Sequence, residues 1–254
     1  DSIVAELKPP RSRRYGTLTR IVGLTLEAKG VSAAVGSICR ILRPDGEHVD
    51  AQVVGFESGS VYLMPLWQAT GLSAGCRVYV HKETDTALVG DGLLGRVVDA
   101  MGEPLDAQPK ITGGKPMSLS GSTPNPMERT PIDKVLDVGI RVLNALLTIG
   151  CGQRIGLIAG SGVGKSVLLG MLTKFTAADV VVIGLIGERG REVKEFIENT
   201  LGPKGLKKSV VVAAPADESP LLRIRATHLA HLYAEHFRAE GKNVLLLMDS
   251  LSRV

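Results

Sequence analysis

Hydrophobic and polar positions follow two different rhythms along the chain, and the change falls near residue 84. Between residues 16 and 83, apolar residues come in short β-branched runs that are separated by turn residues such as Pro44, Asp45 and Gly46. Five or six short strands at this spacing favour a small closed β-barrel. Beyond that point, longer apolar runs alternate with helix-period segments, which is typical of a parallel α/β sheet. The pattern predicts a barrel domain over residues 16–83 and an α/β domain over residues 84–254.

The α/β half predicts a regular order of strands and helices. Continuous apolar runs predict buried strands over residues 179–186, 209–214 and 244–248, and a strand over residues 155–159 that enters a glycine-rich loop. Helical periodicity is present in residues 132–147, 192–200 and 220–240. Ser219 followed by Pro220 is a good start for the last helix, because it joins a capping side chain to a proline that needs no N–H there. The glycine-rich residues 90–105 are interpreted as a junction between the domains.

Composition and charge change this picture little. The chain has 254 residues, 44% hydrophobic and 22% charged, with a net charge of +4, which is ordinary for a soluble globular protein. Residues 1–15 form a basic tail that contains Lys8, Arg11, Arg13 and Arg14. The three cysteines are far apart, which predicts neither a metal site nor a disulfide framework and favours a reducing cytoplasm. Aromatic residues make up only 4% of the chain, which argues against a surface that stacks nucleic-acid bases.

The loop at residues 159–166 reads Ala-Gly-Ser-Gly-Val-Gly-Lys-Ser, which is the spacing of a phosphate-binding P-loop with Ala in place of the first Gly. Its glycines let the backbone approach phosphates closely, and its amides point inward where a helix dipole favours negative charge. Lys165 is expected to reach the β- and γ-phosphates, and the Ser166 hydroxyl to ligate Mg²⁺. The predicted nucleotide-binding residues are Ala159, Gly160, Ser161, Gly162, Val163, Gly164, Lys165, Ser166, Val167 and Arg253.

Charged residues follow two of the predicted strands, at the sheet edge where ligands bind. Asp249 ends one strand and is expected to hold Mg²⁺ through water. Glu188 follows another and is expected to orient and polarise the attacking water, unless it forms a surface ion network with Arg189 or Arg191. Arg189 and Arg253 are both placed to reach phosphate oxygens, and spacing does not choose between them. The predicted catalytic residues are Glu188, Lys165 and Arg189, and the predicted Mg²⁺ ligands are Ser166 and Asp249.

Taken together, these motifs resemble the flagellar protein-export ATPases, which are related to type III secretion ATPases and to the catalytic subunits of rotary ATP synthases. The resemblance is carried by the P-loop and by four other segments, namely residues 90–105 (Gly-Asp-Gly-Leu-Leu-Gly-Arg-Val-Val-Asp-Ala-Met-Gly-Glu-Pro-Leu), 187–193 (Gly-Glu-Arg-Gly-Arg-Glu-Val), 217–225 (Asp-Glu-Ser-Pro-Leu-Leu-Arg-Ile-Arg) and 247–250 (Leu-Met-Asp-Ser). Glu188 favours the catalytic subunits over non-catalytic ring subunits. Residues 219–225 favour the export branch over ATP synthase, and residues 61–66 favour the flagellar proteins over the virulence ones.

The resemblance implies a RecA-like core that hydrolyses Mg-ATP with a Glu-activated water and so energises flagellar type III export. It also implies a homohexamer at the inner face of the cytoplasmic membrane, in which the basic tail is a contact for either the regulator or the membrane. The implied partners are an export regulator, a stalk protein, the export gate, and export substrates with their chaperones. Family members continue with further strands, an arginine finger, an adenine-contacting aromatic residue and a C-terminal helical domain. We therefore expect an incomplete core with low activity.

Other functions share part of the pattern. A virulence secretion ATPase or a rotary ATP synthase catalytic subunit has the same core motifs. An RNA-dependent helicase of the transcription-termination type also has a Gly-Glu-Arg element after its P-loop, but the aromatic-poor barrel disfavours this reading. No nucleic-acid partner is therefore expected.

Overall fold

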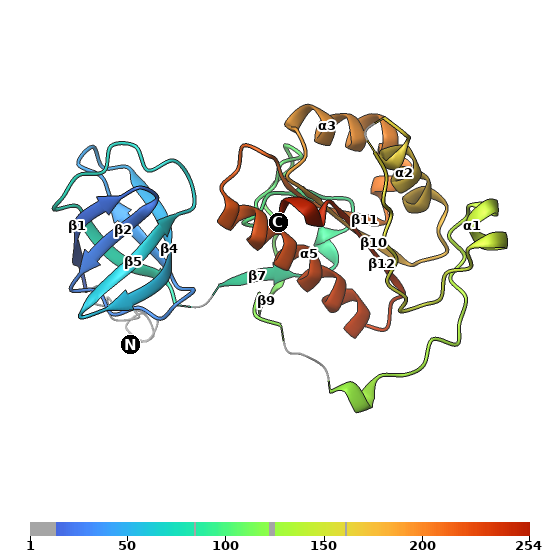
Figure 1. Cartoon of the computed structure of the whole chain (residues 1–254), viewed down its shortest axis with the longest axis horizontal. Helices are drawn as coiled ribbons and strands as arrows, with labels where there is room; N and C mark the ends of the chain where they lie inside the picture. The colour runs from blue at the N-terminus through green and yellow to red at the C-terminus, as the bar shows by residue number, and fades with distance from the viewer. Residues whose placement is uncertain (1–13, 84, 122–124, 161) are drawn as a thin grey trace, which may run out of the picture. The chain divides into compact units, whose positions relative to one another are not determined.

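The computed structural model describes residues 14–83, 85–121, 125–160 and 162–254. The chain divides into two compact units between Asp85 and Thr86, and each unit has its own hydrophobic core (Figure 1). Among the described residues, the structure has no helix with the length and apolar character to cross a membrane.

The first unit is a closed antiparallel barrel. Its six strands are β1 (Gly16–Val22), β2 (Thr25–Lys29), β3 (Ile38–Leu42), β4 (His48–Glu57), β5 (Ser60–Pro65) and β6 (Arg77–Lys82). They join in the order β1-β2-β5-β4-β3-β6, and β6 closes the ring on β1. Alternate residues of the strands point inward, so that Leu18, Leu26, Ile41 and Leu63 are almost fully buried in its centre. The predicted small closed barrel is confirmed.

The second unit contains two sheets. β7 (Thr86–Val89) pairs with β9 (Lys115–Ser118) in an antiparallel ribbon. The main sheet is parallel and has the order β12 (Val244–Asp249), β10 (Val180–Ile186), β11 (Ser209–Ala214) and β8 (Val97–Val98). All residues of β10 and β11 are buried, as expected for strands covered on both faces. The strands predicted from the three apolar runs are therefore confirmed, within one residue at each end.

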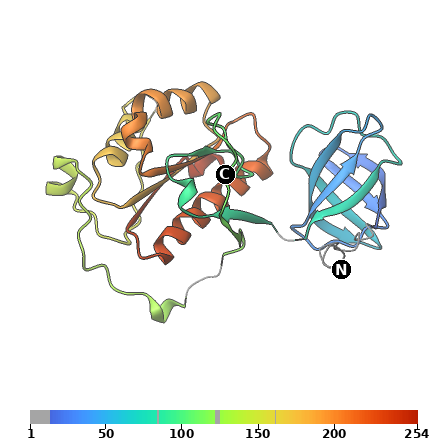
Figure 2. The same ribbon diagram turned by 180° about the vertical axis from the view of Figure 1, so that it is seen from behind.

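Helices cover both faces of the main sheet (Figures 1 and 2). α2 (Lys165–Phe175) and α3 (Gly190–Glu195) pack on one face through Leu169 and Val193. α3 continues into a π-helical turn, η4 (Phe196–Leu201), and into α4 (Gly202–Leu206). α5 (Pro220–Ala239) crosses the other face, where a Cβ at Gly184 would lie in ordinary contact with the Ala230 Cβ, at 3.4 Å. The short helices are α1 (Arg141–Leu146), η2 (Asp91–Leu93), η3 (Pro126–Glu128) and η5 (Leu251–Arg253).

The start of α5 is as predicted. Ser219 is the N-cap, and its hydroxyl accepts a hydrogen bond from the Leu222 amide at 3.3 Å. The apolar stripe of the helix is buried against the sheet at Leu222, Ala226, Leu229, Leu232, Tyr233 and Phe237. The helix ends at Ala239, two residues before Gly241, which has a positive φ of 81°.

The strand predicted over residues 155–159 is wrong for this structure. The segment has no regular structure, and Ile155, Leu157 and Ile158 are exposed, with Ile158 at 98%. An apolar run becomes a strand only where a neighbour completes its hydrogen-bond ladder. No such neighbour lies beside it among the described residues, and β12, the edge strand of the main sheet, pairs only with β10.

The helix predicted over residues 132–147 is also largely wrong, since only Arg141–Leu146 is helical. Gly139 has a positive φ of 69°, and the Asp137 carboxylate accepts hydrogen bonds from its amide at 2.7 Å and from Asn144 Nδ2 at 2.6 Å. This Asx-type turn competes with the helix before it can begin. Val142 and Leu146 are exposed.

Residues 90–105 are not a junction between the domains. They contain η2 and β8, and β8 pairs in parallel with β11 in the main sheet. Acidic side chains fold the segment back on itself. Asp99 Oδ1 accepts hydrogen bonds from the amides of Met101 and Glu103 at 2.8 Å, and Asp106 accepts from Arg96 and from the Val97 amide. The glycines therefore punctuate turns inside the α/β unit.

Candidate functional site

The glycine-rich loop lies at the surface where α2 begins. Gly162 and Gly164 have positive φ angles of 78° and 96°, which few other residues adopt, and Gly164 is the N-cap of α2. Val163 and Val167 are exposed at 68% and 59%, and Gly160 and Ser166 are exposed as well. Ser161 lies outside the described residues. The loop thus exposes its backbone and the first turn of a helix, as an anion-binding loop must.

Lys165 and Asp249 meet although 84 positions separate them. Lys165 Nζ lies 2.5 Å from Asp249 Oδ1, and the side chains are 29% and 7% exposed. Asp249 is the last residue of β12 and lies beside Leu185 of β10, so the carboxyl end of the sheet faces the P-loop helix. The folded chain therefore brings together a residue predicted to bind phosphate and a residue predicted to bind Mg²⁺.

Glu188 belongs to the same electrostatic neighbourhood. It follows β10, is half-buried, and its main-chain carbonyl accepts a hydrogen bond from the Ala216 amide at 3.0 Å. Burial raises the pKa of Glu188, the Asp249 charge raises it further, and the charges of Arg253 and Lys165 act in the opposite direction. A carboxylate with a raised pKa is better matched to proton transfer near neutral pH than an ordinary glutamate.

The two arginines that the sequence left as equal candidates differ in position. Arg253 Nη1 donates a hydrogen bond to the Gly187 carbonyl at 2.5 Å, so it lies next to Glu188. Arg189 instead pairs with Glu192 at 3.2 Å, and its side chain is 67% exposed on α3. The structure brings Arg253 to the site and leaves Arg189 on the surface, where its catalytic role stays a prediction.

The oxygen donors at this position suit Mg²⁺ but do not complete its shell. The Ser166 hydroxyl and the Asp249 carboxylate offer the hard oxygen ligands that Mg²⁺ takes. Within the described ranges, no group of three His, Cys, Asp or Glu side chains is placed to hold a metal ion. The residues therefore fit a Mg²⁺ ion whose other ligands are nucleotide phosphates and water, and not a site made of protein alone.

Two residues near the site were not predicted. Glu192 lies close to Glu188 and contributes to the raised pKa of Glu188. Glu192 belongs to residues 187–193, one of the segments that carry the family resemblance, and this was a usable signal. Arg223 Nη1 donates a hydrogen bond at 3.0 Å to the carbonyl of Arg253, 30 positions later. No spacing rule finds that contact, because its acceptor is a main-chain atom.

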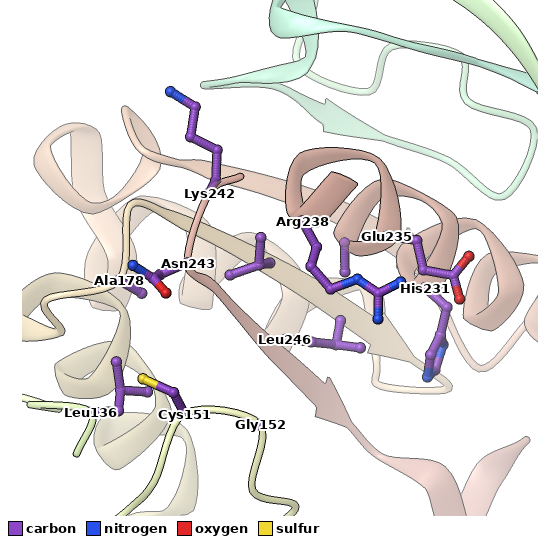
Figure 3. Close-up of a pocket in the computed structure, with 12 residues that line it drawn as sticks. Leu136, Cys151, Gly152, Ala178, His231, Glu235, Arg238, Lys242, Asn243 and Leu246 are labelled. Carbon is purple, nitrogen blue, oxygen red and sulfur yellow. The ribbon is translucent and has the colours of Figure 1, made fainter. Parts of the chain in front are cut away.

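A separate pocket of about 360 Å³ lies near the amino-terminal ends of β10 and β12 (Figure 3). Cys151 and Leu136 line one side of it, and His231, Glu235 and Arg238 of α5 line another. None of the predicted site residues lines this pocket, so it is distinct from the phosphate-binding loop.

Known proteins match both units. Residues 139–254 match the model of the ATP synthase alpha/beta family, nucleotide-binding domain, and residues 18–80 match that family's beta-barrel domain. The chain is 55% identical over 241 residues to the flagellum-specific ATP synthase of Pseudomonas aeruginosa. This alignment covers 94% of this chain and 53% of that protein. It is 53% identical over 254 residues to the flagellum-specific ATP synthase of Salmonella typhimurium. That alignment covers 96% of this chain and 56% of the relative.

A solved structure has the same fold. It is the assembled ATPase EscN in complex with its central stalk EscO, from the type III secretion system of enteropathogenic E. coli. The TM-score is 0.86 at 38% identity, and the match covers 94% of this chain and 58% of that one. The chain thus spans somewhat more than half the length of the relatives that it matches. Since both units match consecutive domains of one family, the chain belongs to the ATP synthase alpha/beta family.

Proposed function

We propose that the protein binds Mg-ATP at the P-loop and hydrolyses it, and that this hydrolysis energises flagellar type III protein export. The observation that carries the proposal is the meeting of Lys165, Asp249 and Glu188 at the carboxyl end of the sheet. These are the three kinds of residue that phosphoryl transfer to water requires, namely a phosphate-binding cation, a metal-binding carboxylate and a carboxylate that positions water. The relatives named flagellum-specific ATP synthase support the link to export.

The proposed mechanism assigns one task to each residue. Backbone amides of the loop and the Lys165 ammonium bind the phosphates, and Lys165 leaves Asp249 as it does so. Ser166 and Asp249 would hold Mg²⁺, Asp249 through water, and the ion would supply positive charge beside the phosphate oxygens. Glu188 accepts a hydrogen bond from the attacking water and orients it, and Arg253 contacts the phosphate oxygens.

Two measurements on matched variants test the proposal. The wild-type chain is expected to bind a fluorescent ATP analogue in the presence of Mg²⁺ and to release phosphate. Lys165→Ala should lose binding. Glu188→Gln should keep binding and lose about a hundredfold or more in turnover, because only the group that positions the water changes. Glu195→Gln, an exposed change on α3, is the control. Unchanged turnover in Glu188→Gln would show that another group positions the water.

The assembly and location are also proposals. We infer a homohexamer that works with a stalk protein, an export regulator, the export gate, and substrates with their chaperones, at the cytoplasmic face of the membrane. The support is the solved relative, which is described as assembled and in complex with its central stalk. Sedimentation with and without Mg-ATP tests the assembly, and flotation with anionic vesicles tests the membrane contact. A chain that stays monomeric at every nucleotide concentration would contradict the assembly.

The strongest alternative is a virulence secretion ATPase. Identity of 53–55% to two flagellar relatives, against 38% to EscN, favours the flagellar function. Complementation of a motility defect and of a virulence-secretion defect by the whole protein would separate the two. RNA-stimulated turnover would instead support the helicase alternative.

A further inference from the structure

We propose that Arg223 is a positioning residue, which holds the main chain at Arg253 so that the Arg253 guanidinium stays beside Glu188 and within reach of the terminal phosphate. This inference rests on the proposed function. It assigns to the first turns of α5 a part in recognising the nucleotide, although α5 packs on the face of the sheet opposite to α2.

The first link joins α5 to the turn after β12. Arg223 Nη1 donates to the Arg253 carbonyl at 3.0 Å. Arg223 Nε is buried and has no hydrogen-bond partner among the described residues. A buried donor without a partner costs free energy. The Arg223 guanidinium therefore keeps this position although one of its N–H groups is unsatisfied. Within the described part of the chain, the one hydrogen bond that the Arg223 side chain makes is the bond that restrains Arg253.

The second link joins Arg253 to the loop after β10. Its Nη1 donates to the Gly187 carbonyl at 2.5 Å, and its side chain runs along the backbone of Gly187. A Cβ at Gly187 would lie 2.7 Å from the Arg253 Cβ and 2.8 Å from its Cδ, so only glycine leaves room for this packing. Because Gly187 directly precedes Glu188, the cation and the predicted catalytic carboxylate are held as neighbours.

The turn that carries Arg253 also has hydrogen bonds of its own, which are longer than the bond from Arg223. Arg253 lies in η5, where the Arg253 amide donates to Ser250 at 3.3 Å and the Val254 amide to Leu251 at 3.4 Å. These are longer than the usual 2.9–3.0 Å of backbone hydrogen bonds. The 3.0 Å bond from Arg223 is shorter than either, and it comes from a regular helix, α5.

A double-mutant cycle tests this inference in the 254-residue chain. We would measure the affinities of Mg-ATP and Mg-ADP by calorimetry for the wild type, Arg223→Met, Arg253→Met and the double variant. Each single change should lower the ratio of ATP to ADP affinity about tenfold, because the terminal phosphate loses a charged hydrogen bond. The double variant should be no worse than Arg253→Met alone, since Arg223 acts only through Arg253.

Arg223→Lys and Arg238→Met complete the set. Lysine at position 223 can still donate to the Arg253 carbonyl, so it should restore most of the ratio. Arg223→Ala, which also removes the donor, replaces Arg223→Met in the cycle if that variant does not fold. Arg238 lies exposed near the other end of α5, and its loss should leave the ratio unchanged. If the loss in Arg223→Met persists undiminished when Arg253 is already methionine, or if the ratio does not change, the inference is wrong. A wild-type chain that does not bind Mg-ATP would refute the proposed function itself, and this inference with it.

Discussion

The ion pair between Arg96 and Asp106 gives a prediction of stability whose size can be worked out. Asp106 accepts two hydrogen bonds from the Arg96 guanidinium, at 2.7 and 3.0 Å, and one each from the amides of Val97 and Gln108. The two side chains are only 12% and 9% exposed. Asp106→Asn keeps the shape of the residue but removes the charge, and it leaves the guanidinium without its anion beside β8.

The magnitude follows from the pKa of Asp106. Burial alone would raise this pKa, but the bonds from Arg96, Val97 and Gln108 outweigh it and lower the pKa from 3.8 to about 2. Because the folded pKa is depressed, the carboxylate stabilises the fold above about pH 4, and this contribution is lost as the pH falls through about 2. A shift of this size corresponds to about 2 kcal/mol. The unpaired guanidinium adds to the cost, so Asp106→Asn should lose about 3 kcal/mol at pH 7.

Urea unfolding, followed by the helical circular-dichroism signal, measures this loss in the relevant unit. All the described helices come after Thr86, whereas the only tryptophan, Trp67, lies before it and reports on the barrel. The control is Glu103→Gln, which breaks the exposed Lys110–Glu103 pair and should cost less than about 1 kcal/mol. The difference between wild type and Asp106→Asn should shrink as the pH falls from 4 towards 2. A difference that does not depend on pH would refute this account of the pair.

Three further predictions concern the site and the core. Asp249→Asn removes a predicted Mg²⁺ ligand, so Mg²⁺ should strengthen the binding of ATP less than it does in the wild type; an equal effect of Mg²⁺ in both would contradict this. Gly187→Ala places a Cβ 2.7 Å from that of Arg253, at a φ of +73°, so turnover should fall while Mg-ATP binding persists; unchanged phosphate release would contradict the packing. Phe237→Ala removes a fully buried ring from α5 and should lower the free energy of urea unfolding by about 4 kcal/mol, and a loss below about 1 kcal/mol would mean that the ring is not packed there.

Sequence predicted the strands of the second unit well where the signal was local. β11 matches its predicted range because its apolar run is bounded sharply by Lys208 and Pro215. The start of α5 was equally clear, because Ser219 caps it and Pro220 fits the first helical position. The failures came where structure depends on distant partners. Residues 155–159 have a strand's composition without a neighbouring strand, and the helix before them gives way to the turn at Asp137.

In the candidate site, too, sequence predicted what depends on local signals and missed what depends on distant partners. Lys165, Glu188 and Asp249 were found because each follows a recognisable motif or ends an apolar run, and parallel strands bring their carboxyl ends together. Their contacts were not predictable, because the pairing of Lys165 with Asp249 and of Arg189 with Glu192 depends on side-chain directions. The contact of Arg223 with Arg253 links a side chain to a main-chain oxygen, which no residue pattern encodes.

The two units also differ in how their sheets end, and this difference bears on handling the protein. The barrel closes on itself, so each of its strands has two neighbours, whereas β12 pairs on one side only among the described residues. Its residues Leu245, Leu246 and Met248 are only half-buried. An open apolar edge is a template on which another chain adds a strand. Aggregation at high concentration should therefore begin at β12, and the barrel expressed alone should stay monodisperse where the whole chain does not.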